Sequence, residues 1–388
     1  MIYLDYAATA PLAEEAWQAM QAWLAPGRGF ANPASDHVAG RAARDAVEQA
    51  RAQVAGLIGA QPEEVVWTSG ATESNNLAIK GAVEFHARGR AHVLSSRIEH
   101  KCVLDACRWL ETAGATRPVR VSYLQPDRLG RITLPQVMQA LGAETVLVSL
   151  MWVNNEIGNV TDIPTIATAL RERGVMLHVD AAQAAGKLPV DVREVPVDLM
   201  SLSAHKLYGP KGVGALFVRR RPRARVAPQM HGGGHEWGMR SGTLATHQVV
   251  GMGAACARAQ RTLMADAEHA TGLRERLWRG LQDMPGVLRN GDADHAAPHI
   301  LNLSFEGVEG ESLRAALHDL AVSSGAACSS ATAEPSYVLR ALGRGEFLAQ
   351  ASLRFSFGRD TGVAHVDTAI RRVRHEVQRL RALAPAST

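Results

Sequence analysis

Short apolar segments alternate with helical segments through the first two thirds of the chain, and this alternation restricts the folds that the chain can adopt. The apolar segments are long enough for strands, and they are residues 65–67, 92–95, 119–124, 145–153, 175–179, 199–204 and 215–218. Helical segments such as residues 101–113 and 163–173 lie between them. Strands that alternate with helices predict a parallel sheet that is covered by helices on both faces.

The clearest helix is expected at residues 41–57. Apolar residues recur there at steps of four and three and share one face, and they are Ala43, Val47, Ala50, Val54 and Leu57. Gly59 is expected to end this helix. A long helical region at about 247–281 interrupts the alternation, and after Pro285 the pattern becomes strand 300–305, helix 311–320, strand 353–357 and helix 366–383. This last part predicts a smaller α+β domain.

The composition excludes several classes of protein. A chain of 388 residues with 46% hydrophobic residues and a net charge of +4 is expected to form a substantial core, and its charge is too small to indicate nucleic-acid binding. Its longest apolar run, residues 145–153, is much shorter than the roughly 20 residues of a membrane-spanning helix, and no secretory signal is visible. Four cysteines without a CxxC pair indicate neither a disulfide framework nor structural zinc, so we expect a reducing cytoplasm.

Chemically active residues follow several of the predicted strands. Ligands of a parallel sheet gather beyond the carboxyl ends of its strands. Residues 68–73 follow strand 65–67 and open a helix, which favours phosphate binding by free N–H groups, although small residues at a helix start are often ordinary turn and cap residues.

A carboxylate and a lysine follow two further strands. Asp180 ends one of them, with Gln183 three residues later, and Lys206 follows the other. A lysine amine can form a Schiff base with the aldehyde of a pyridine cofactor, while an anionic aspartate keeps the ring nitrogen protonated. The alternative is that Asp180 and Lys206 form a structural ion pair.

These residues lie in segments that together resemble the class V aminotransferases, and more narrowly the group I cysteine desulfurases of iron-sulfur cluster assembly. The similar segments extend over nearly the whole chain, at residues 4–9, 68–76, 99–101, 153–158, 178–183, 201–212, 231–236, 239–243 and 334–340. The resemblance implies the α/β fold of PLP-dependent transferases of fold type I. It places a large PLP-binding domain with a mainly parallel seven-stranded sheet at residues 13–258. Residues 1–12 and 259–388 would form a small α+β domain that carries a cysteine loop at about 323–335.

The resemblance also implies pyridoxal 5′-phosphate (PLP) as the cofactor and a homodimer as the assembly. Lys206 would bond covalently to the cofactor, Asp180 would pair with its ring nitrogen, and Gln183 would hydrogen-bond its ring hydroxyl. His100 would stack on the ring and shuttle protons, whereas an isolated histidine is more often structural. The phosphate would be bound by Ala71, Thr72, Ser203 and His205, and by Thr243 of the neighbouring subunit.

Two residues are expected to bind the substrate carboxylate. Alternation in residues 353–357 places Arg354 and Ser356 on one face of a strand. A guanidinium on that face could bind an amino-acid carboxylate, and the alternative is a solvated arginine. The resemblance places Asn155 near both the cofactor and the substrate.

Cys328 is the residue that distinguishes this chain's expected chemistry. Cys102, Cys107 and Cys256 are expected to be buried, whereas Cys328 lies in a run of small residues at 323–333. The resemblance implies that L-cysteine is converted to L-alanine and that its sulfur is transferred to Cys328 as a persulfide. Sulfur acceptors would then serve iron-sulfur assembly and tRNA thiolation. No intrinsic metal site is expected, although Cys328 could be a transient cluster ligand shared with a scaffold protein.

Other motifs leave alternatives open. His231 and His235 flank three glycines without an apparent third zinc ligand. The basic residues 219–225 could bind RNA or form a solvated turn, or could dock acidic partners such as a frataxin-like protein or ferredoxin. We expect no direct nucleic-acid partner and no membrane.

Two other functions compete with cysteine desulfuration. One is a selenocysteine lyase or another class V activity, and the other is a non-catalytic sulfur-assembly scaffold. The chain also departs from the resembled pattern, because Trp237 replaces the usual arginine and the segment after Leu383 is short. No proposed catalytic group is lost through these departures.

Overall fold

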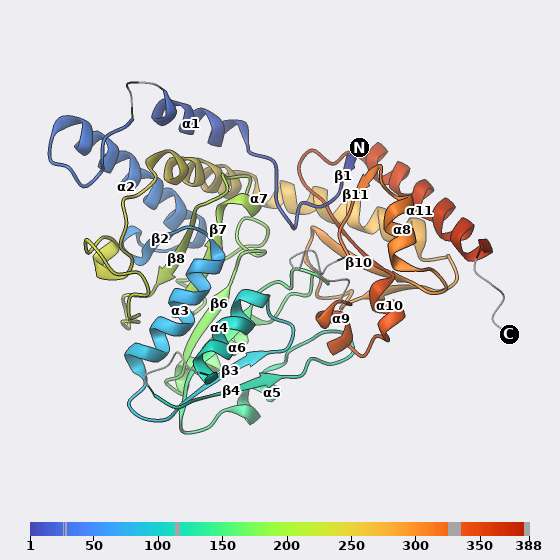
Figure 1. Ribbon diagram of the computed structural model, residues 1–388, viewed down its shortest axis with the longest axis horizontal. Helices are drawn as coiled ribbons and strands as arrows, with labels where there is room; N and C mark the ends of the chain where they lie inside the picture. Colours follow the sequence, from blue (N-terminus) through green and yellow to red (C-terminus); the bar gives the residue numbers. More distant parts are fainter. Residues whose placement is uncertain (26, 28, 113–116, 325–334, 384–388) are drawn as a thin grey trace.

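A seven-stranded sheet forms the centre of the larger lobe (Figure 1). The computed structural model describes residues 1–25, 27, 29–112, 117–324 and 335–383. The strand order is β2-β8-β7-β6-β5-β3-β4. The strands are β2 (Val65–Thr68), β3 (Ala91–Ser96), β4 (Val119–Leu124), β5 (Thr145–Met151), β6 (Met176–Asp180), β7 (Leu199–Ser203) and β8 (Gly214–Val218).

All neighbouring strands are parallel except that β8 is antiparallel to both of its neighbours. The chain between β7 and β8 is too short for a crossover helix, so β8 returns beside β7 in the opposite direction. The sheet is therefore mainly parallel, with one reversed strand inside it.

Helices cover both faces of this sheet, as the alternation predicts. One face packs against α3 (Ala71–His86) and α4 (Lys101–Thr112). The other packs against α2 (Val38–Ile58), α5 (Leu134–Ala140), α6 (Ile163–Glu172) and the start of α7 (Thr246–Leu281), while α1 (Glu14–Leu24) packs on α7. Short 3-10 helices are η1 (Pro62–Glu64), η2 (Ala204–Lys206) and η3 (Glu236–Gly238).

The helix predicted at residues 41–57 is confirmed as part of α2. Gly59 ends it with a φ of 69°, and a Cβ there would clash with Asp191 Oδ1. Glycine is required at this position because it adopts the left-handed conformation and leaves room for the neighbouring carboxylate.

A second, antiparallel sheet with the order β12-β10-β9 forms the centre of the smaller lobe. Its strands are β9 (Val287–Asn290), β10 (Ile300–Phe305) and β12 (Ser352–Ser356). The helices beside it are α8 (Gly310–Ala316), α9 (Tyr337–Ala341), α10 (Glu346–Gln350) and α11 (Val363–Leu383). The helix predicted at 311–320 is shorter than expected, because Leu320 begins β11 (Leu320–Ala321), which pairs with β1 (Ile2–Tyr3).

Helix α7 runs from the larger lobe into the smaller one (Figure 1). Its first half contributes Val249, Met252 and Cys256 to the core of the large sheet, and its second half contributes Leu273 and Leu277 to the core of the small sheet. The expected domain boundary at residues 258/259 falls inside this helix and stays a prediction. No helix in the described parts of the chain is long and apolar enough to cross a bilayer.

Candidate active site

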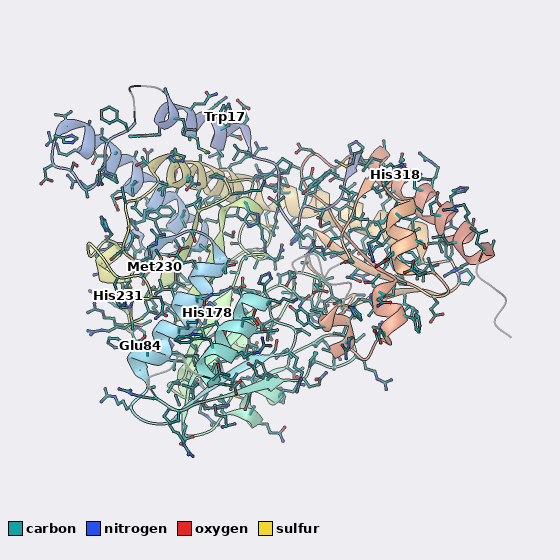
Figure 2. All side chains as sticks on the ribbon, viewed as in Figure 1. Trp17, Glu84, His178, Met230, His231 and His318 are labelled. Atoms are coloured by element: carbon teal, nitrogen blue, oxygen red, sulfur yellow. The ribbon has the colours of Figure 1, made fainter. Side chains whose placement is uncertain are left out.

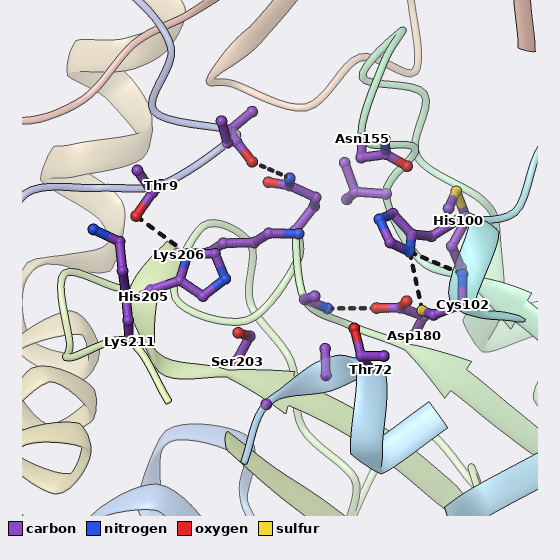
Figure 3. A pocket seen from close by; sticks show the side chains of 18 of the residues that line it. Thr9, Thr72, His100, Cys102, Asn155, Asp180, Ser203, His205, Lys206 and Lys211 are labelled. Carbon is purple, nitrogen blue, oxygen red and sulfur yellow. Dashed lines mark hydrogen bonds between the residues drawn. The ribbon is translucent and has the colours of Figure 1, made fainter. Parts of the chain in front are cut away.

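A cavity of about 580 Å³ lies at the carboxyl ends of β6 and β7. The structure brings ten of the sequence-predicted site residues to its wall, namely Ala71, Thr72, His100, Asn155, Asp180, Gln183, Ser203, His205, Lys206 and Arg354. Asp180 is the last residue of β6, and Lys206 lies in η2 directly after β7. Because these two strands are parallel neighbours, their ends deliver both side chains to the same cavity (Figure 3).

Asp180 is held rigidly in the cavity wall. Its Oδ2 accepts a hydrogen bond of 2.8 Å from Asn75 Nδ2, and its Oδ1 accepts one of 2.9 Å from the Ala182 N–H. Only 7% of the residue is exposed. A buried, oriented carboxylate of this kind can bind a protonated ring nitrogen.

His100 is held in one tautomer by Cys102. The Cys102 backbone N–H donates to His100 Nδ1 at 3.2 Å, and Cys102 Sγ lies 3.0 Å from the same nitrogen (Figure 3). Nδ1 is therefore an acceptor, and the neutral ring carries its proton on Nε2. Burial and the nearby Lys206 ammonium lower the pKa of His100, so the neutral form prevails at neutral pH.

The start of α3 provides an anion-binding end of the cavity. Its N-cap, Gly70, has a φ of 151° and provides no side-chain cap. The first N–H groups of a helix have no intrahelical partner and attract negative charge. A Cβ on Gly214 would lie 2.6 Å from Gly70 Cα, so only glycine allows β8 to approach this turn.

His205 and two lysines lie near this helix end. His205 Nδ1 is 3.2 Å from Thr9 Oγ1. Burial and the cations of Lys206 and Lys211 lower the pKa of His205 to about 4, so its imidazole is neutral at physiological pH. Thr9 and Lys211 line the cavity but are not sequence-predicted site residues, because neither follows a predicted strand directly.

Arg354 is buried, which excludes the alternative of a solvated strand arginine. It is 4% exposed and donates through Nη2 to Asp5 Oδ1 and through Nη1 to Asn155 O, both at 2.7 Å. Arg354 Nε and Asn155 Oδ1 are buried and have no hydrogen-bond partner among the described residues. Both residues line the cavity, so an amino acid bound there would meet a guanidinium and an amide.

Gln183 also presents a hydrogen-bond donor to the cavity. Its Nε2 donates to Ala7 O at 2.7 Å, and its Oε1 lies 3.2 Å from His299 Nε2. An amide nitrogen has two hydrogens. One of them remains for a ligand in the cavity.

Two predicted site residues, Thr243 and Cys328, are not among the described residues that line the cavity. Thr243 is exposed on the segment before α7. Cys328 lies outside the described residues, as does most of the loop expected at 323–335.

The expectation for the cysteines is correct at two positions and wrong at a third. Cys107 and Cys256 are fully buried in the core. Cys102, by contrast, lines the cavity and accepts a hydrogen bond from Asn75 Nδ2 at 3.1 Å. Burial raises the pKa of its thiol to about 12, so it is protonated. Its position two residues after His100, at the start of a helix after a strand, is a signal that could have revealed this placement.

The histidine pair around the triple glycine does not form a metal site in the described structure. His231 is exposed at the edge of the larger lobe, whereas His178 is buried within it (Figure 2). No group of three histidine, cysteine, aspartate or glutamate residues in the described ranges is arranged to hold a metal ion.

The cavity fits PLP by its donor set. Lys206 supplies an amine for an aldehyde, Asp180 a carboxylate for a ring nitrogen, and Gln183 a donor for a hydroxyl. The helix start at Gly70 fits a phosphate because it combines open space with N–H groups.

Comparisons with known proteins identify the family of the chain. The aminotransferase class-V family model matches residues 2–368. The chain is 54% identical over 385 residues to a cysteine desulfurase IscS of Escherichia coli O139:H28 (strain E24377A / ETEC), covering 99% of this chain and 94% of that protein.

Two solved structures are also similar. One is described as a NifS-like protein, with a TM-score of 0.89 and 30% identity, and covers 98% of this chain and 100% of that one. The other is described as SspA in complex with cysteine, with a TM-score of 0.81 and 36% identity, and covers 92% and 99%. The chain therefore belongs to the aminotransferase class V family and, within it, to the pyridoxal-phosphate-dependent cysteine desulfurases.

Proposed function

We propose that this enzyme converts L-cysteine to L-alanine and transfers the sulfur to Cys328, which forms a persulfide. One observation carries this proposal: a single cavity holds Lys206, Asp180 and the buried guanidinium of Arg354. The similar SspA structure was solved with cysteine, which supports cysteine as the substrate here. The same geometry would also accept selenocysteine, but no contact in the site favours it.

Arg354 and Asn155 are proposed to orient the substrate. Asp5 and Asn155 O hold two nitrogens of the Arg354 guanidinium, so the side chain has one fixed position. The guanidinium would bind the substrate carboxylate, and the Asn155 amide beside it would form a hydrogen bond with the substrate. This arrangement costs little reorganisation when substrate binds, because both side chains are already in place.

Lys206, His100 and Asp180 are proposed to manage protons. Bound PLP supplies an electron-withdrawing ring that stabilises negative charge at the substrate α carbon. Lys206 Nζ would hold the cofactor and, once displaced by substrate, would take the proton from that carbon. Asp180 would keep the ring nitrogen protonated, and His100 would donate and recover a proton at Nε2.

Cys328 is proposed to accept the sulfur. Its thiolate would attack the substrate sulfur, so that a sulfur–sulfur bond forms as the carbon–sulfur bond breaks. The electron pair of the broken bond stays with the substrate carbon, which is protonated to give alanine. The described residues on both sides of residues 325–334 support this role: Ser323 pairs with the Arg354 backbone, and Ser336 Oγ donates to Glu156 Oε2 beside Asn155.

The assembly and the acceptors are also proposals. Thr243 is exposed, as expected if it serves the phosphate of a neighbouring subunit in a homodimer. The persulfide sulfur of this enzyme would be used for iron-sulfur cluster assembly in the cytoplasm. A scaffold protein and other sulfur acceptors would receive it.

A basic surface is proposed to dock an acidic partner, such as a frataxin-like protein or ferredoxin. Arg220, Arg223 and Arg225 are exposed and line a separate cavity of about 220 Å³ together with Phe85 and Trp237. Trp237 is 52% exposed, and its ring lies 4.9 Å from Arg51 Cζ. The replacement of arginine by this tryptophan therefore makes the surface more aromatic without changing the active site.

The decisive experiment measures alanine and sulfide together. The holoenzyme would be incubated with L-cysteine and a reducing thiol, and wild type would be compared with Cys328→Ala. We expect equal amounts of both products from wild type, and their loss in the variant together with loss of the persulfide on the peptide that contains residue 328.

The matched control is Cys256→Ala, which removes a thiol that is buried in α7 and does not line the cavity. This control should retain both products. Full sulfide release by Cys328→Ala would refute the proposed acceptor, and a wild-type holoenzyme that makes neither product would refute the proposed reaction.

A further inference from the structure

We propose that His299 is a positioning residue of the cofactor site, which acts by fixing the side-chain amide of Gln183. The inference rests on the proposed contact between Gln183 and the ring hydroxyl of PLP. His299 directly precedes β10 of the small sheet and is 1% exposed. It is absent from the cavity wall formed by the described residues, so its effect on a ligand would pass through Gln183.

The hydrogen bonds determine which way the Gln183 amide points. The amide nitrogen lies 2.7 Å from Ala7 O, a backbone carbonyl that can only accept. A rotated amide would place two acceptor oxygens against each other at this distance. The amide oxygen therefore faces His299 Nε2 at 3.2 Å, and His299 must be the donor.

The surroundings of His299 keep it in this donating form. Burial and the cations of Lys187 and Arg354 hold its pKa well below the usual range, so the ring carries one proton. With that proton on Nε2, Nδ1 has none. This agrees with the finding that Nδ1 is buried and lacks a hydrogen-bond partner among the described residues.

Gln183 Nε2 has a second hydrogen, which is free for a ligand. The hydrogen bonds to Ala7 O and His299 Nε2 fix the direction in which this hydrogen points. Without a donor at position 299, Gln183 Oε1 would be buried and unsatisfied, and the hydrogen bond to Ala7 O alone would hold the amide in its present orientation. His299 also connects this amide to the smaller lobe, because its backbone oxygen accepts a hydrogen bond of 3.0 Å from the Phe357 N–H. The orientation of the Gln183 amide, which we propose as a donor to the cofactor, thus depends on His299 of the smaller lobe.

A matched pair of variants tests the hydrogen bond. His299→Gln and His299→Met have similar length and volume, but only glutamine supplies an N–H to Gln183 Oε1. Each variant would be prepared without cofactor and titrated with PLP, and the visible absorption spectrum of the bound cofactor would be recorded. We expect affinity about tenfold weaker and a shifted absorption band for His299→Met, and near wild-type behaviour for His299→Gln.

A second comparison separates positioning from general packing. In a Gln183→Leu background, His299→Met should cause no further loss of affinity, because the group that it positions is gone. An equal loss in both backgrounds, or an unchanged spectrum in His299→Met, would overturn the proposal. Thermal unfolding of each variant identifies any that do not fold, in which case Gln and Asn at position 299 are compared instead, since the shorter asparagine cannot reach.

These readouts are independent of turnover. If wild type releases no alanine or sulfide from L-cysteine, the proposed reaction fails, yet the affinity and spectral differences still decide the role of His299.

Discussion

Glu99 and Glu156 illustrate at the residue scale how burial near the cavity changes proton binding. Glu99 is 1% exposed and accepts a hydrogen bond of 2.6 Å from Ser96 Oγ. Burial, with a smaller contribution from Asp180, raises the pKa of Glu99 to about 8. Burial also raises the pKa of Glu156 to about 7. The Glu99 carboxyl is therefore mostly protonated at neutral pH, and it directly precedes His100, for which we propose a role in proton transfer.

This raised pKa predicts a pH-dependent stability. An unfolded glutamate has a pKa near 4.3, so between about pH 5 and pH 8 the folded state binds more protons than the unfolded state. Stability from this group is therefore present at the low end of the window and lost as pH rises. We expect Glu99→Gln, which resembles the protonated form, to lose about 3–4 kcal/mol less unfolding free energy than wild type over this range.

Urea unfolding of wild type and Glu99→Gln at about pH 5 and about pH 8 measures this difference in unfolding free energy. Other groups titrate in the same window, but they are common to both proteins and cancel in the comparison. If wild type and Glu99→Gln lose the same free energy, Glu99 is not protonated in the folded state.

At the scale of elements, the junction of β8 with α3 forms the end of the cavity where we propose that the phosphate binds. A Cβ on Gly214 would lie 2.5 Å from Leu202 O and 2.6 Å from Gly70 Cα. Both contacts involve backbone that cannot move without separating β7, β8 and the start of α3. The position of the first N–H groups of α3 therefore depends on the absence of a side chain in a different strand.

Gly214→Ala is accordingly expected to weaken cofactor binding. The added methyl group would displace the turn at Gly70, and we expect PLP affinity to fall by about tenfold or more in an absorbance titration. The control is Gly272→Ala in the interior of α7, where a Cβ would meet nothing within 4 Å. That variant should bind the cofactor normally. Its unfolding free energy should be about 0.5–1 kcal/mol higher than that of wild type. Unchanged affinity in Gly214→Ala would show that the turn does not hold the phosphate.

At the scale of the whole molecule, the proposed homodimer makes each active site depend on two chains. Thr243 is exposed and is not among the described residues that line the cavity of its own chain, whereas Lys206 is one of them. If Thr243 serves the neighbouring subunit, a defect at Thr243 and a defect at Lys206 affect different sites of a mixed dimer.

Subunit mixing tests this arrangement. Thr243→Val and Lys206→Ala homodimers should each have little activity. A dimer with one chain of each kind should contain one intact site, since the Lys206 of one chain is served by the Thr243 of the other. We expect alanine release to rise on mixing under conditions that exchange subunits. No gain in confirmed mixed dimers would place Thr243 in the site of its own chain or in none.

Local patterns in the sequence were sufficient for most elements and for the placement of Asp180 and Lys206, whereas the chemistry expected of these two residues came from the family resemblance. Strand 300–305 matches β10 residue for residue, and the carboxyl-end rule placed Asp180 and Lys206 at one site because parallel neighbouring strands end together. The sequence by itself thus determined where strands and helices form and which reactive groups follow them, because side-chain periodicity acts over a few residues.

Only the tertiary structure decided how distant segments complete the site. It paired Leu320 with Ile2 and so ended α8 early, buried Arg354 against Asp5, and brought Cys102 to the cavity wall. It also placed His299 against Gln183, 116 residues away. The physical reason is that burial and hydrogen-bond partners depend on which surfaces pack together, and that packing leaves no periodic signal in either segment alone.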